Sequence, residues 1–420
     1  MTNHELTKQK KSPIKEYGML ILWTVAFFVL LLLRDAYSVT VNKYILLALA
    51  CVSVVTLSTD KVIGLYCFLF PLYVGLPGNY MTLLLIARLL VDMKNLRFKA
   101  TSFLLTLCVG AFVLCQNLFL GQTGIVQMVL IAGVAVILLL FSYKGDLNKI
   151  MLVLMFSAGV AALGYIMLTA TLQVYELSDL MSSYQRLGAD STDYVSSTVM
   201  NVSIDPNFYG AFAIAAVSTA APLALEKETK RGLRILLLSF TVVSIFVCIV
   251  GLSRAAFLIL ALWGVLYVLL RRSFKGAWLV AAVAVLVIVA MPDVLNAMVT
   301  RLEEDDMATG NGRTQLMEKF LDAWLENPGT LLFGVGLFNC NVHCTPLQFL
   351  FGGGIVLFSL VVALTVSYKP KFNGQISLAK SLPFWITFVM LMTVPAAGLL
   401  NFMFPLVYVG LLSSTKENGK

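Results

Sequence analysis

A single histidine lies in a polar stretch of an otherwise apolar chain. His343 ends the stretch 334–343, which reads GVGLFNCNVH, and the other histidine, His4, lies in a charged N-terminal tail. The pKa of an unperturbed imidazole lies near neutrality, so a histidine in a loop between membrane spans is a candidate acid–base group. Arginines expected on the same side of the membrane, Arg254 and Arg313, indicate an anionic substrate.

The composition of the chain predicts the kind of fold that holds these side chains in place. The chain of 420 residues is 59% hydrophobic and 12% charged, with a mean hydropathy of +0.89. Apolar runs of roughly 17–25 residues recur without the alternation of barrel strands, which predicts an all-α polytopic membrane protein. We expect one integral membrane domain over 1–420, without a cleaved signal peptide. About fourteen transmembrane helices are expected, at 18–33, 43–59, 62–77, 80–93, 101–119, 123–142, 149–173, 207–225, 235–252, 255–270, 276–292, 346–368, 381–396 and 399–414.

Charge predicts the orientation of these spans. With both termini in the cytoplasm, the outer side keeps, of the 30 Lys and Arg, only Arg34, Lys43, Arg186, Arg254, Arg301, Arg313 and Lys319. This bias follows the positive-inside rule. The basic charge thus reflects topology, and no basic run interleaved with aromatic residues indicates nucleic-acid binding.

Two long extracytoplasmic loops are expected, at 174–206 and 293–345. The second should contain an amphipathic helix over 314–326, with Leu316, Phe320, Leu321 and Trp324 at helical spacing. Long loops often carry function. No ATP is present outside the membrane, so an enzyme there would need an activated substrate carried by lipid.

The motifs on the outer side resemble those of one family. They are Asp205-Pro206-Asn207 opening a span, Gly251-Leu252-Ser253-Arg254 in a hairpin, Gly312-Arg313 leading through Trp324 and Asn327-Pro328, then Gly334-x-Gly336-x-x-Asn339 and His343. In this order and spacing they resemble the O-antigen ligase and O-antigen polymerase superfamily, with the closest likeness over 200–360. Cys344 stands where that family often has an asparagine.

The resemblance implies a membrane glycosyltransferase that uses an undecaprenyl-diphosphate-linked glycan as donor. It implies inversion at the anomeric carbon and no cofactor or metal. His343 would be the catalytic base, and Arg254 and Arg313 would bind the leaving diphosphate. Substrate contacts are expected from Asp205, Asn207, Arg186, Arg301 and Asn339. The location implied is a bacterial cytoplasmic membrane, with a flippase and a chain-length regulator of the same pathway as candidate partners.

Other interpretations stay open. Arg186 and Arg301 are also explained as solvated loop charges, and Asp205 and Asn207 as helix caps. Cys340 and Cys344 leave a disulfide open. A polymerase that joins repeat units is favoured over a ligase that moves a finished glycan to another acceptor, such as a lipid A core. A lipid-glycan flippase is less favoured, because charges within the spans are nearly absent.

Overall fold

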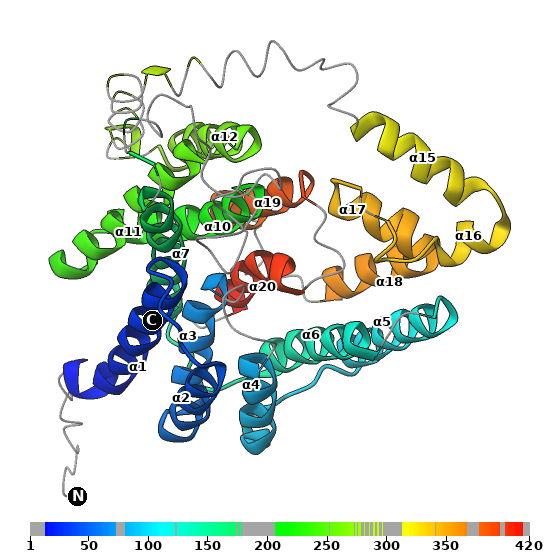
Figure 1. The fold of residues 1–420 in the computed structure, drawn as a ribbon, viewed down its shortest axis with the longest axis horizontal. Coiled ribbons are helices and arrows are strands. Elements are labelled where there is room, and N and C mark those ends of the chain that lie inside the picture. The colour runs from blue at the N-terminus through cyan, green and yellow to red at the C-terminus, as the bar shows by residue number, and fades with distance from the viewer. Residues whose placement is uncertain are drawn as a thin grey trace, which may run out of the picture.

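The structure of the protein, a computed structural model, is built from helices joined by turns and irregular segments in its described residues (Figure 1). It describes residues 13–72, 80–121, 124–173, 206–251, 253–272, 313–340, 342–367, 378–394 and 400–414, with isolated positions within 175–178 and 274–296. Within these ranges there is no β-strand, and Leu96 and Tyr143 form an isolated antiparallel bridge.

A helix lies on each predicted span except 276–292, which falls mostly outside the described residues. The hairpin expected within 235–270 is present as two helices that meet near Ser253. In chain order the helices are α1 (Pro13–Asp35), α2 (Lys43–Thr56), α3 (Thr59–Leu69), α4 (Tyr80–Val91), α5 (Ala100–Phe119), α6 (Gly124–Ser142), α7 (Lys149–Leu172), α10 (Pro206–Leu225), α11 (Arg231–Val250), α12 (Arg254–Arg271), α15 (Arg313–Leu325), α16 (Pro328–Phe333), α17 (Thr345–Leu347), α18 (Gly353–Ser367), α19 (Leu378–Leu391) and α20 (Leu400–Ser414).

Seven stretches of the described chain are helical, long enough and apolar enough to cross a membrane. They are α1, α5, α7, α10, α11, α12 and the stretch Thr345–Ser367. The helices α2, α4, α19 and α20 are apolar but shorter. The chain is therefore a multi-pass helical membrane protein, while the number of fourteen spans and the cytoplasmic termini stay predictions.

The interior of the bundle is formed by α7 and α10. In each of them 78% of the apolar window is buried, compared with 17% in α1 and 28% in α5. A helix that is apolar all round is either buried in protein or faces lipid. It follows that α1 and α5 present most of their surface to lipid, whereas α10 packs against α7, α11, α12, α19 and α20.

The bundle has two ends, which we name after one residue each. At the Tyr143 end, the Tyr143 hydroxyl donates to Asp60 at 2.8 Å, and Asn148 donates to the Tyr17 hydroxyl at 3.2 Å. At the Ser253 end lie the starts of α10 and α12. The C-terminal end of α10 lies towards the Tyr143 end of the bundle. This follows because α20 contacts both the later turns of α10 and the last turn of α6. Side chains predicted to face the two sides of a membrane thus lie at the two ends of one bundle.

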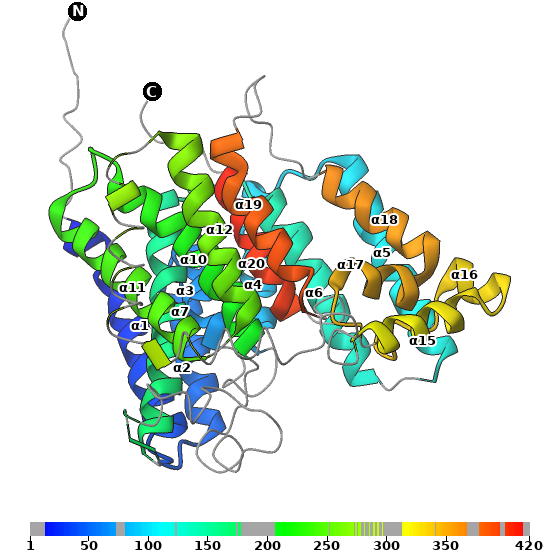
Figure 2. The same ribbon diagram turned by 90° about the horizontal axis from the view of Figure 1, so that it is seen from above.

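A smaller group of helices, α15 to α18, packs beside α5 (Figures 1 and 2). The helix expected over 314–326 is present as α15. Its inner face is formed by the partly buried side chains of Met317, Phe320 and Trp324, which pack against the segment around Cys340. Leu321, expected on the same face, is instead 38% exposed.

The span predicted over 346–368 is not one continuous helix. Between α17 and α18 lies a π-helical turn, Gln348–Gly352, and Gly354 has non-helical dihedral angles of φ 70° and ψ 178°. In lipid an irregular backbone is tolerated only where protein or a water-filled cavity surrounds it. Gly353 and Gly354 are both buried, and the segment that covers them belongs to the candidate site.

Candidate functional site

The starts of α10 and α12 meet at the Ser253 end. Ser253 is buried, and its hydroxyl donates a hydrogen bond of 2.7 Å to the side-chain oxygen of Asn207. The same hydroxyl oxygen accepts from the N–H of Ala256 and caps α12. A Cβ atom at Gly210 would lie 2.7 Å from the Ala256 Cβ, so the glycine permits this close approach. The structure therefore joins two of the motifs found in the sequence.

Asn207 lies in the first turn of α10, which begins at Pro206. It is therefore not at the capping position, and its side-chain oxygen accepts a hydrogen bond from another helix. Asp205, the residue before the helix, lies outside the described residues. Of the two interpretations of Asn207, the cap is wrong, because the helix starts one residue earlier.

Arg254 is the first residue of α12 and is half-buried. A helix N-terminus carries a partial positive charge from its unpaired N–H groups. Arg254 adds a guanidinium group to that charge, and a phosphate favours both. The start of α12 therefore brings positive charge to the Ser253 end of the bundle.

The end of α19 connects the starts of α10 and α12 to the segment that carries His343. A Cβ atom at Gly210 would also lie 3.0 Å from Met390 Cε. Four residues further on, the backbone oxygen of Val394 accepts a hydrogen bond of 2.7 Å from the Thr345 hydroxyl. In both ribbon views α19 lies between α12 and α17 (Figures 1 and 2). Because His343 is two residues before Thr345, the structure places it at the same end of the bundle as the start of α12.

His343 is the central residue of a tight turn. The N–H of Cys344 donates to the backbone oxygen of Val342 at 2.6 Å, which closes a three-residue turn. Val342 and Cys344 are buried, while His343 is partly exposed. The buried neighbours anchor the turn and leave the histidine at the protein surface.

Two backbone segments pack directly against each other below this turn. Val335 N–H donates to the oxygen of Phe351 at 3.0 Å, and Gly336 N–H donates to the oxygen of Gly352 at 2.9 Å. We call this pair of segments, 334–337 and 351–354, the glycine crossing. The approach is so close that a Cβ atom at Gly352 would lie 2.9 Å from the Cα of Leu337, so a glycine is needed there.

The requirement for glycine in the crossing is clearest at Gly334 and Gly354. Gly334 has φ 78° and ψ 172°, and Gly354 has φ 70° and ψ 178°, a region that only glycine occupies readily. A Cβ atom at Gly334 would collide with the backbone of Gly352, and one at Gly354 with the backbone oxygen of Leu332. The backbone of the crossing is thus fixed by its glycines.

Gln116, in the last turn of α5, fastens the crossing from the side. Its amide nitrogen donates to the oxygens of Phe333 at 2.6 Å and Gly352 at 2.7 Å, and its amide oxygen accepts from Leu337 N–H at 3.3 Å. Gln348 adds a 3.3 Å hydrogen bond to the oxygen of Leu337. Sequence reasoning missed both glutamines. The available signal was a polar side chain inside an apolar run, which in membranes usually has a role.

Of the remaining predicted site residues, Asn339 is described in full and the arginines only in part or not at all. Asn339 is exposed, and its side-chain nitrogen donates to the oxygen of Val335 at 3.4 Å. Arg313 begins α15, but its side chain lies outside the described residues, as do Arg186 and Arg301 entirely.

Cys340 and Cys344 are both free and buried thiols. Burial raises the pKa of the Cys340 thiol to about 11 and raises that of Cys344 in the same direction. Both are therefore protonated at neutral pH and pack as apolar groups with Val342 and Phe351. In the described part of the chain, no cluster of His, Cys, Asp or Glu has the arrangement of a metal site.

A cavity of about 550 Å³ lies at the Tyr143 end and is lined by none of these residues. The candidate site at the Ser253 end therefore consists of two parts at the same end of the bundle, linked by α19: the starts of α10 and α12, and the tight turn with the broken helix. The fold and site define a polytopic helical membrane protein with an irregular, glycine-fixed segment in one membrane-spanning stretch. Comparison with protein families, curated proteins and solved structures gives no match to this chain.

Proposed function

We propose that the chain is a glycosyltransferase of a bacterial cytoplasmic membrane. It joins oligosaccharide repeat units carried on undecaprenyl diphosphate, on the outer face, into a longer polysaccharide. The observation that carries the proposal is the placement of Arg254, at a helix N-terminus, at the same end of the bundle as His343. One side chain suits a departing diphosphate and the other suits a hydroxyl nucleophile.

The reaction needs one bond made and one broken. The acceptor sugar hydroxyl attacks the anomeric carbon of the donor and forms the new glycosidic bond. His343 takes the proton of that hydroxyl, and the bond from the anomeric carbon to the lipid diphosphate breaks. The electron pair leaves on the diphosphate oxygen, whose growing negative charge Arg254 binds together with the N–H groups of α12. Attack opposite the leaving group inverts the anomeric centre.

Two further observations support this assignment. The turn that holds His343 is anchored on buried residues and on the glycine crossing, as a positioned base requires. Irregular backbone in a membrane-spanning stretch, with a π-helical turn, is frequent at functional sites.

The test uses the full-length protein in liposomes with a radiolabelled undecaprenyl-diphosphate oligosaccharide. We expect products lengthened by whole repeat units. His343→Ala should lower the turnover by a factor of about 10² to 10⁴, the usual contribution of a general base. Arg254→Lys should lower it about tenfold, because a lysine lacks the forked contact to phosphate oxygens.

Matched controls are present in the same chain. His4→Ala changes the other histidine, and Arg271→Lys changes an arginine at the opposite end of α12. Both should keep wild-type turnover. Wild-type turnover in His343→Ala would refute the base assignment, and transfer only to a different acceptor would show a ligase instead of a polymerase.

A further inference from the structure

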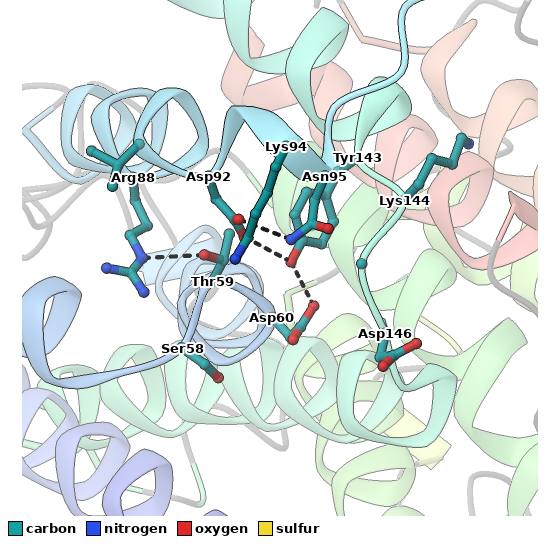
Figure 3. A pocket seen from close by; sticks show the side chains of 12 residues that line it. Ser58, Thr59, Asp60, Arg88, Asp92, Lys94, Asn95, Tyr143, Lys144 and Asp146 are labelled. Atoms are coloured by element: carbon teal, nitrogen blue, oxygen red, sulfur yellow. Dashed lines mark hydrogen bonds between the residues drawn. The ribbon is translucent and has the colours of Figure 1, made fainter.

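The cavity at the Tyr143 end is a polar space among the ends of α3, α4 and α6 (Figure 3). It has a volume of about 550 Å³. The charged residues that line it are Asp60, Asp92, Asp146, Arg88, Lys94 and Lys144. Acidic and basic side chains are thus equal in number, which suits a ligand that carries both charges.

One side of the cavity favours a cation. The Tyr143 hydroxyl donates to Asp60 at 2.8 Å and lies 3.5 Å from Asp92, but it has only one proton to donate. A hydrogen bond of 2.8 Å from Asn95 lowers the pKa of Asp92, helped by Thr59 and the charge of Lys94. Carboxylate oxygens on this side therefore keep unused acceptor capacity.

The other side favours an anion. The Arg88 Nε donates to the Thr59 hydroxyl at 3.2 Å, and in the described part of the chain no carboxylate forms an ion pair with Arg88. Figure 3 shows its terminal amino groups pointing away from Asp60. Two amino groups of a guanidinium are the usual forked contact to a phosphate.

The rim of the cavity is continuous with apolar surface. Val91, which lines the cavity, is 80% exposed, and Val55, three residues before the lining residue Ser58, is 78% exposed. Leu83 and Leu90 of α4 are exposed as well. In a membrane these side chains contact acyl chains, so the cavity opens where a lipid headgroup would lie.

We propose that this cavity binds the headgroup of a zwitterionic phospholipid with a primary ammonium group, phosphatidylethanolamine. The phosphate lies at Arg88, the ammonium group donates to Asp60 and Asp92, and the acyl chains run along α2 and α4. On the orientation expected from the charge distribution, the lipid belongs to the cytoplasmic leaflet. The site is independent of the proposed transferase chemistry at the other end of the bundle.

Other ligand classes fit these charges less well. A polyphosphate would meet three carboxylates. A divalent cation needs a closer group of acidic side chains than the described residues offer. A quaternary ammonium headgroup has no N–H to donate to Asp60, and a glycerol headgroup has no cation.

Native mass spectrometry of the full-length protein tests the proposal. The protein is loaded with equal amounts of phosphatidylethanolamine, phosphatidylcholine and phosphatidylglycerol. We expect one phosphatidylethanolamine to be retained about tenfold over either competitor, because one charge-assisted hydrogen bond is worth about that factor. The Arg88→Gln variant should retain about tenfold less phosphatidylethanolamine than the wild-type protein. The matched control Arg97→Gln, an exposed cation at the same end but outside the cavity, should retain it.

Asp60→Asn should shift the preference from phosphatidylethanolamine towards phosphatidylglycerol. Equal retention of the three lipids by the wild-type protein would overturn the proposal, and this comparison needs no variant to fold. Equal retention by Arg88→Gln and Arg97→Gln would overturn it too. Displacement of the lipid by soluble phosphoethanolamine at the same concentration would show that the acyl chains add nothing, and would refute a lipid site.

Discussion

Replacing Gln116 by leucine should open the segment that holds His343. Leucine is apolar and a good helix former, so α5 keeps its place in the membrane. The change removes three hydrogen bonds, to the oxygens of Phe333 and Gly352 and from the N–H of Leu337. At about 1 kcal/mol each, the closed segment loses about 3 kcal/mol, which lowers the ratio of closed to open forms about 100-fold.

Amide hydrogen exchange measures this opening directly, because protected amides exchange through local opening. In the wild-type protein the N–H groups of Val335, Gly336 and Cys340 are bonded to backbone oxygens. In Gln116→Leu we expect the peptide covering 334–345 to exchange about 100-fold faster, with α7 and α10 unchanged.

The control is Gln173→Leu, at the end of α7. That glutamine is exposed, and its amide makes one long hydrogen bond of 3.5 Å to the oxygen of Thr169. It should leave exchange in 334–345 unaltered. Wild-type protection in a folded Gln116→Leu protein would refute the reasoning, as would an equal loss of protection in both variants.

Three further predictions concern the same regions. Gly354→Ala should lower the free energy of unfolding by at least about 2 kcal/mol, because a side chain there is strained and collides with backbone, whereas Gly232→Ala, in open space on α11, should be neutral or slightly stabilising in thermal unfolding. Cysteines introduced as Asn339→Cys and Asp146→Cys should react with an impermeant maleimide from opposite sides of the membrane, and labelling of both from one side would contradict the two ends of the bundle. The Cys340 thiol should be alkylated slowly at pH 8 and faster as the pH approaches about 11. The thiol of the unfolded chain has its ordinary pKa of 9.0, so the free energy of unfolding should fall as the pH rises above that value. A flat alkylation profile would contradict the raised pKa.

Hydropathy predicted most of the membrane-spanning helices because each is an apolar run bounded by charge. The hairpin around Ser253 followed from a run too long for one helix, and α15 followed from its periodic apolar residues. Such features depend on residues close together in the chain, so one sequence is enough to find them.

The break in the span 346–368 could not be predicted in the same way. When hydropathy is averaged over a window of residues, Gly352, Gly353 and Gly354 count as part of an apolar run. What interrupts the helix is a backbone segment that packs onto it, fastened by Gln116, a residue 236 positions before Gly352. The meeting of Asn207 with Ser253 likewise depends on the packing of two helices, so the sequence indicated the candidate residues but not how they meet.

The glycine crossing joins the two ends of the stretch from Gly334 to Gly354, so the residues between them form a closed loop. Its two segments are joined to each other by backbone hydrogen bonds, and side-chain hydrogen bonds from Gln116 and Gln348 add to them, so most side chains between Asn341 and Leu347 take no part in the joint. The middle of this loop should therefore tolerate replacement as a unit. Residues 341–347 could be exchanged for those of another protein that has the same two glycine positions and a glutamine opposite them. The glycine crossing would still close the loop around the exchanged residues.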